Sequence, residues 1–138
     1  MTRQFTLLCA VVLSLSMAAQ KQDRLKHNFN YADTVRTYGM YIPQNVAPSA
    51  PLVVYTHGYG SKTRWRQDLN ATADKYGFAV CYPDGTPDLR GNDGWKVGYP
   101  SQESMLIDET NFFCKLLDEV CRRFNLSREN VFCTGFSN

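Results

Sequence analysis

Hydrophobic positions in this sequence fall into short runs that polar, glycine-rich or helix-like segments separate. Three runs are continuously apolar, with β-branched and aromatic residues, and they predict strands buried on both faces. These runs are residues 52–56, 78–82 and 131–134. Residues 27–31 and 35–42 predict a hairpin of two further strands that turns near Ala32 and Asp33.

Two helices are predicted between these strands. The first contains Leu69, Ala73 and Tyr76 at helical spacing, and Gly77 is placed to end it. The second runs from about residue 104 to residue 124, with one apolar stripe and one charged face. The stripe consists of Phe113, Leu116, Leu117, Val120, Cys121 and Phe124. Strands that alternate with helices in this way predict an α/β fold with a mainly parallel sheet and the hairpin as its antiparallel edge.

Composition and charge exclude several classes of protein. The chain has 138 residues, 43% of them hydrophobic and 20% charged, which fits a single globular domain. Its net charge is +2, and its basic residues are scattered, so we expect no nucleic-acid partner. No internal apolar run is long enough to span a membrane.

The N-terminus has the pattern of a secretory signal peptide. Arg3 precedes an apolar stretch at residues 7–15, and Ser16 and Ala18 place small residues two positions apart, as a signal peptidase requires. A buried N-terminal strand or helix is the alternative interpretation. Residues 1–18 are therefore the predicted signal peptide, and residues 19–138 form the predicted domain of a secreted or periplasmic protein.

The four cysteines after this segment are predicted to be free thiols. Cys114 and Cys121 lie seven residues apart on one predicted helix, a rise of roughly 10 Å that a disulfide does not reach. Cys81 and Cys133 lie in apolar runs, where buried thiols pack as small hydrophobic groups. No spacing of cysteines and histidines suggests zinc.

The last predicted strand leads into a candidate nucleophile motif. Gly135-Phe136-Ser137-Asn138 matches four of the five positions of G-x-S-x-G, in which a sharp turn from strand to helix exposes a serine hydroxyl. The motif alone is weak evidence, and it gains specificity from the buried-type strand that directly precedes it.

A second motif has the place and composition of an oxyanion-binding loop. His57-Gly58-Tyr59-Gly60 follows the predicted strand at residues 52–56, and glycines allow backbone amides to point at a developing negative charge. We expect the Tyr59 amide to be one donor and the Asn138 amide to be the other. His57, Gly58 and Gly60 are expected to support this loop.

The sequence contains two histidines, His27 and His57, and both precede Ser137. A His57, Asp108, Ser137 order matches trypsin-like proteases, but those enzymes are antiparallel β-barrels. In the α/β-hydrolase order, the acid and the histidine both follow the serine. We therefore expect them beyond residue 138, so that this chain alone is truncated and inactive.

Several other polar and aromatic residues have two interpretations. Trp95 and Tyr99 either line a substrate cleft or cover the core beneath a long surface loop at residues 84–94. Asp84 is expected in a turn and Asp108 at a helix terminus. The spacing of the acidic and amide residues in the loop, Asp88, Asn92 and Asp93, fits no calcium-loop template. No metal and no cofactor are expected.

Five segments together resemble the polyhydroxybutyrate depolymerase and feruloyl esterase family. They are residues 40–43, 52–60, 82–85, 94–98 and 131–138, and the resemblance extends from about residue 34 to the end. The resemblance implies an incomplete α/β-hydrolase fold and a secreted serine esterase that acts on polyesters or plant cell-wall phenolic esters. It also implies Ser137 as nucleophile, with the loop at residues 57–60 beside it. Tyr59 departs from the family, in which many members carry a cysteine at this position.

Two alternatives remain open on the sequence. An exported peptidase of the prolyl-oligopeptidase type would share the serine motif and cleave amides. A non-catalytic fragment would keep the fold without the reaction.

Overall fold

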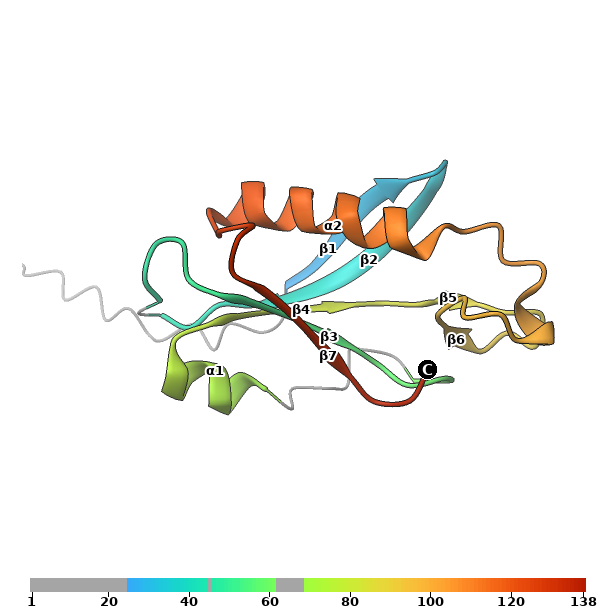
Figure 1. The fold of residues 1–138 in the computed structure, drawn as a ribbon, viewed down its shortest axis with the longest axis horizontal. Helices are drawn as coiled ribbons and strands as arrows, with labels where there is room; N and C mark the ends of the chain where they lie inside the picture. The colour runs from blue at the N-terminus through green and yellow to red at the C-terminus, as the bar shows by residue number, and fades with distance from the viewer. Residues whose placement is uncertain (1–24, 45, 62–68) are drawn as a thin grey trace, which may run out of the picture.

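The computed structural model describes residues 25–44, 46–61 and 69–138 (Figure 1). The predicted signal peptide at residues 1–18 lies outside this part of the chain. Within the described ranges, no helix is long and apolar enough to cross a membrane.

A five-stranded mixed sheet organises the molecule, in the order β1-β2-β4-β3-β7. The strands are β1 (Leu25–Tyr31), β2 (Thr34–Tyr41), β3 (Leu52–Thr56), β4 (Ala79–Pro83) and β7 (Val131–Gly135). β3 pairs in parallel with β4 on one side and with β7 on the other, whereas β2 pairs antiparallel with both β1 and β4. The predicted central position of residues 52–56 and the predicted edge hairpin are both confirmed. Ala32 and Asp33 turn the hairpin with φ of 46° and 59°, the signs that a tight two-residue turn requires.

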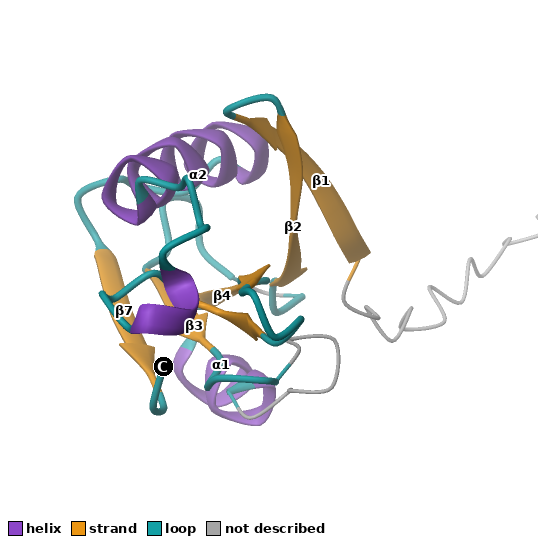
Figure 2. Cartoon of the chain, turned by 90° about the vertical axis from the view of Figure 1, so that its right-hand side faces the viewer, coloured by secondary structure: helices purple, strands orange, loops and turns teal. Residues whose placement is uncertain are grey.

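The α-helices of the described residues, α1 and α2, cover opposite faces of the sheet (Figure 2). α1 (Asn70–Tyr76) ends at Gly77, as predicted, and α2 (Glu109–Phe124) covers the other face. Alternate residues of each strand point to opposite faces. On the α2 side, the buried strand residues Leu52, Val54 and Cys81 belong to one hydrophobic cluster with Phe112, Leu116 and Val120 of the helix. On the α1 side, Val80 and Tyr82 form a second cluster with Ala73.

The second helix begins five residues later than predicted. Asp108 has an extended backbone and its side chain accepts a hydrogen bond from the Asn111 amide at 2.9 Å, so it caps the helix. The expectation that Asp108 is a helix-terminus carboxylate is therefore confirmed. Phe112, which the predicted stripe omitted, is the fully buried aromatic residue of α2, while Phe113 is only partly buried.

Cys81, Cys114, Cys121 and Cys133 are all free, as predicted. Cys81 and Cys133 pair with Val54 from its two sides, so one strand separates them. The prediction that Cys133 is buried is wrong, because β7 is an edge strand among the described residues and its residues are largely exposed.

The predicted surface loop after β4 contains a short antiparallel pair, β5 (Thr86–Pro87) and β6 (Asp93–Gly94). A single turn of 3-10 helix, η2 (Pro100–Gln102), follows. These segments lie beyond the carboxyl end of β4, near the end of the chain (Figure 1).

Candidate active site

Ser137 lies in the turn that follows β7, with its backbone in the left-handed region at φ 60°. A non-glycine residue adopts this conformation at a cost, and such strained residues cluster at functional sites. Gly135 makes the turn possible. A Cβ at this position would overlap the Thr56 side chain and lie 2.8 Å from the Thr56 carbonyl oxygen, so only glycine allows β7 to approach β3 this closely.

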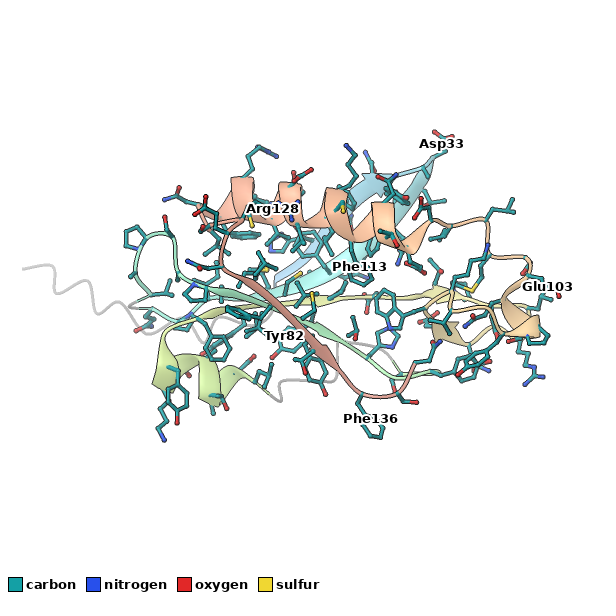
Figure 3. All side chains as sticks on the ribbon, in the orientation of Figure 1. Asp33, Tyr82, Glu103, Phe113, Arg128 and Phe136 are labelled. Carbon is teal, nitrogen blue, oxygen red and sulfur yellow. The ribbon has the colours of Figure 1, made fainter. Side chains whose placement is uncertain are left out.

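The loop after β3 lies directly against this turn. β3 and β7 are parallel neighbours with Thr56 opposite Gly135, so both loops leave the same edge of the sheet. A Cβ on Gly58 would lie 2.9 Å from the Phe136 carbonyl oxygen and 3.4 Å from the Ser137 Cβ. The two motifs that the sequence singles out are therefore in contact. Phe136 itself projects away from the sheet (Figure 3) and is 68% exposed.

The amides of Tyr59 and Asn138 have no hydrogen-bond partner among the described residues. The next two amides in the first loop are already used, since Gly60 donates to the Asp93 carbonyl at 2.7 Å and Ser61 donates to the Gly58 carbonyl at 3.0 Å. Among the described residues, the two amides expected to bind an oxyanion therefore have no competing hydrogen bond.

His57 is buried and both of its ring nitrogens are occupied. The Gly85 amide donates to Nε2 at 2.8 Å, so Nε2 carries no proton. Nδ1 therefore carries the proton and donates it to the Gly58 carbonyl at 2.8 Å. These bonds hold the loop, and they leave His57 no ring nitrogen with which to deprotonate Ser137.

His27 lies on β1, where its ring contacts the rings of Tyr38 and Phe124, each with centroids 5.2 Å away. Burial, and then the nearby positive charge of Arg123, lower the pKa of His27. It is not among the residues that line the cavity at Ser137. Neither histidine of the chain is therefore placed to act as a base toward Ser137.

Trp95 connects the two motif loops. Its indole Nε1 donates to the His57 carbonyl at 2.9 Å. Its backbone amide donates to Asn138 Oδ1, and its carbonyl accepts from Asn138 Nδ2, each at 2.9 Å. Trp95 is 6% exposed; its bond to the His57 carbonyl is buried, and its two bonds with Asn138 are partly buried.

Gln102 holds Trp95 from the other side. Its Nε2 donates to the Trp95 carbonyl at 2.7 Å, and its Oε1 accepts from the amides of Val97 and Tyr99. The side chain is 1% exposed. No sequence pattern points to Gln102, because a polar residue in a loop has no periodicity that distinguishes burial from exposure.

A cavity of about 490 Å³ opens at Ser137, within the range of small-molecule sites. It is lined by Thr56, Trp95, Val97, Tyr99, Phe113, Ser137 and Asn138. Trp95 and Tyr99 thus lie at the cavity, and Trp95 also contributes to the core. That this cavity is a substrate cleft stays a prediction. The sequence did not identify Thr56 and Val97, and it assigned Phe113 to the core. Figure 3 shows Phe113 directed from α2 toward the sheet.

Asp88 is the acidic residue of the surface loop whose hydrogen bonds connect it to the candidate oxyanion loop. Asp88 accepts hydrogen bonds from Tyr59, Arg90 and Asn92. Among the residues that the structure describes, no group of three or more His, Cys, Asp or Glu side chains could hold a metal ion.

A mixed sheet with helices on both faces, a serine in a left-handed turn after β7 and a glycine loop after β3 define the chain as part of an α/β-hydrolase fold. No protein-family model matches the sequence. The chain is 27% identical over 105 residues to a bifunctional acetylxylan esterase/xylanase from Neocallimastix patriciarum, and this match covers 74% of the chain and 14% of the relative.

Solved structures with the same fold include three hydrolases. An S-formylglutathione hydrolase from Agrobacterium tumefaciens has a TM-score of 0.62 at 16% identity, over 81% of this chain and 47% of its own. A thermostable esterase has a TM-score of 0.60 at 20% identity, and the match covers 83% of this chain and 34% of the esterase chain. An acetyl xylan esterase from Aspergillus awamori has a TM-score of 0.51 at 17% identity, and the match covers 72% of this chain and 37% of the esterase chain. The chain spans less than half the length of each of these relatives.

Proposed function

We propose that the protein is a serine carboxylic-ester hydrolase with Ser137 as the nucleophile. One observation carries the proposal, namely the strained backbone of Ser137 in contact with the glycine loop at residues 57–60. The amides of Tyr59 and Asn138, which have no hydrogen-bond partner among the described residues, are the donors that would bind the oxyanion. The names of the relatives, which are esterases or other hydrolases, support the same class of reaction.

The proposed reaction passes through an acyl-enzyme. A general base takes the proton of Ser137 Oγ as this oxygen bonds to the acyl carbon, and the carbonyl oxygen becomes an oxyanion. The two amides stabilise that charge until the alcohol leaves with a proton. Water then attacks the acyl carbon, releases the carboxylic acid and restores Ser137. Since both ring nitrogens of His57 are occupied and His27 lies elsewhere, the base is a residue other than these two histidines.

We further propose that the substrates are esters of plant cell-wall polysaccharides and that the protein acts after export. The acetylxylan esterase activity named for the Neocallimastix relative supports this substrate class. The cavity beside Ser137 has apolar and aromatic walls in Val97, Tyr99 and Trp95, which suits the acyl group of such an ester. The resemblance to feruloyl esterases supports the same class of substrates, the esters of plant cell walls. The sequence also resembles polyester depolymerases, so polyhydroxybutyrate is included as a comparison substrate.

The test uses the full-length gene product with p-nitrophenyl acetate, acetylated xylan, methyl ferulate and polyhydroxybutyrate as substrates. We expect hydrolysis of the aryl acetate and of acetylated xylan, and a loss of about 10³-fold or more in kcat for Ser137→Ala. Ser104→Ala, which changes an exposed serine, is the control and should retain full activity. A prolyl p-nitroanilide serves as the peptidase substrate. Cleavage of that amide in preference to the esters, or hydrolysis that survives Ser137→Ala, would contradict the proposal.

A further inference from the structure

The side chain of Tyr59 is anchored in the loop after β4 by a buried carboxylate. Its hydroxyl donates to Asp88 Oδ2 at 2.7 Å and accepts from Asn92 Nδ2 at 3.1 Å. The edge of its ring lies close to Gly94, where an added Cβ would be 3.1 Å from Tyr59 Cδ2. Asp88 is 7% exposed although it carries a charge.

The loop is organised around the Asp88 carboxylate. Its Oδ1 accepts from the Arg90 amide at 2.9 Å and from the Asn92 amide at 3.1 Å. The side chain of Ser101 is a further contributor that lowers the pKa of this carboxylate. The Asp88 backbone completes the arrangement, since its amide donates to the Asn92 carbonyl at 3.0 Å and its carbonyl accepts from Gly91 at 2.9 Å. Asp88 is therefore fixed, and a fixed carboxylate can position the phenol that binds it.

Tyr59 needs such an anchor because of its neighbours in the chain. It lies between Gly58 and Gly60, which have no side chains to restrict the backbone, and Gly60 has φ of 74°. The peptide group that carries the Tyr59 amide is held at its carbonyl, since the Gly58 carbonyl accepts from His57 Nδ1 at 2.8 Å and from the Ser61 amide at 3.0 Å. A second anchor for this peptide group is the side chain of Tyr59. Its ring, its hydroxyl and the bond from the Gly60 amide to the Asp93 carbonyl all tie it to the same loop.

The ionisation of Asp88 strengthens the anchor. The hydrogen bond from Tyr59, followed by those from Ser101 and the Asn92 and Arg90 amides, lowers the pKa of Asp88 to about 2. The carboxylate is therefore charged at every pH at which an esterase is assayed. A phenol bound to a charged acceptor forms a shorter and stronger hydrogen bond than one bound to a neutral acceptor.

We propose that Asp88 is a positioning residue for ester hydrolysis. It binds the Tyr59 hydroxyl and thereby directs the Tyr59 amide toward the oxyanion that forms at Ser137. This inference rests on the proposed function and adds to it a residue that does not line the cavity and does not contact the substrate.

The experiment compares Asp88→Asn, Tyr59→Phe and the double variant of the full-length gene product, with p-nitrophenyl acetate as substrate. Asp33→Asn, at the exposed tip of the β1–β2 hairpin, is the control and should leave kcat and KM unchanged. We expect each single variant to lower kcat about 10-fold or more and to change KM less than twofold, since oxyanion binding occurs only in the transition state. The double variant should be no worse than Tyr59→Phe alone, because both substitutions break the same bond.

A second readout separates positioning from simple stability. Affinity for a phenylboronic acid, which forms a tetrahedral adduct with an active-site serine, should fall in parallel with kcat, and the pH profile of kcat should not shift. If Asp88→Asn fails to fold, Tyr59→Phe still tests the inference, because it keeps the carboxylate. Unchanged kcat in the folded variants, effects confined to KM, or additive losses in the double variant would overturn it. Absence of any Ser137-dependent hydrolysis in the wild-type protein would instead reject the proposed function.

Discussion

At the scale of single residues, the turn at Ser137 depends on space that its neighbours leave free. A left-handed backbone costs a non-glycine residue about 1–2 kcal/mol, so the rest of the structure must hold it in place. Gly135 meets this requirement by allowing β7 to lie against Thr56, and Gly58 does the same from the facing loop.

Gly135→Ala should therefore disrupt the site. The added methyl group would overlap the Thr56 side chain and backbone, and relief of such overpacking costs about 1–3 kcal/mol of unfolding free energy. We expect a loss of that size in urea titrations, together with loss of ester hydrolysis. Thr134→Ala, one residue earlier and exposed, should change the free energy of unfolding by less than about 0.5 kcal/mol. Equal stability of the two variants would show that the turn is not close-packed.

Trp95→Phe tests the bond between the two motif loops. The variant keeps an aromatic ring but removes the Nε1 donor, which leaves the His57 carbonyl unsatisfied at a cost of about 1–3 kcal/mol. Because a small displacement of a binding group lowers catalytic rates steeply, kcat for an aryl ester should fall about 10- to 100-fold. Tyr76→Phe, which changes an aromatic residue that is 66% exposed, is the control. Full activity in Trp95→Phe would mean that the Asn138 contacts alone align the loops.

Sequence patterns found the residues with backbone signatures and missed those with buried polar contacts. Gly58, Gly135 and Ser137 stand in motifs whose spacing reflects a specific backbone turn, so they were identified. Gln102 and the role of Asp88 were not, since their burial depends on how a loop of polar residues folds back on the sheet. No periodicity in a loop carries that information.

At the scale of secondary-structure elements, long periodic segments were predicted more accurately than their ends. The apolar stripe identified α2, but its start was set by one cap, Asp108, which a regular pattern does not reveal. The predicted stripe also contained Phe113 and omitted Phe112, whereas in the structure Phe112 is fully buried and Phe113 is partly buried. This difference matters for the site, because Phe113 is left partly exposed and lines the cavity at Ser137.

The hairpin strand β1 should make stability depend on pH through His27. Burial lowers the pKa of His27 in the folded state below its value in the unfolded chain, which is about 6.5. The unfolded chain therefore binds a proton more readily, so this contribution to stability is present above about pH 6.5 and is lost as the pH falls through the folded pKa. Arg123 acts in the same direction and Glu119 opposes it.

His27→Phe retains the ring contacts with Tyr38 and Phe124 and removes the titration. Urea unfolding at pH 7.5 and pH 5.5 should show a smaller loss of stability at the lower pH for the variant than for the wild-type protein. Lys26→Ala, at an exposed neighbouring position, controls for a change in surface charge. An identical pH dependence in wild-type and His27→Phe proteins would exclude His27 as the source.

At the scale of the whole molecule, the order of strands followed from the sequence while the exposure of β7 did not. Burial on both faces was inferred for residues 131–134 from their apolar character. In the described part of the chain, β7 pairs only with β3, and Phe132 is 60% exposed. Whether a strand is central or at the edge depends on its neighbours and is not encoded in the strand itself.

Residues 1–138 produced alone should self-associate through β7. An edge strand with exposed apolar side chains offers unpaired backbone groups to a second copy. We expect dimers or larger species in analytical ultracentrifugation and a shift toward monomer for Phe132→Lys. Val35→Lys, at a residue 62% exposed on the hairpin, provides the matched control and should not change the distribution. Monomers at all concentrations would contradict the role of β7.

The central claim is that Ser137 forms a covalent acyl intermediate, and a phosphorylating ester analogue tests it most directly. The full-length gene product is treated with diethyl p-nitrophenyl phosphate, digested and mapped by mass spectrometry. We predict one diethylphosphoryl group per protein molecule, located on Ser137, with loss of hydrolysis in proportion to labelling and no adduct in Ser137→Ala. Inhibition with the adduct on another residue, or full labelling that leaves hydrolysis intact, would contradict the account.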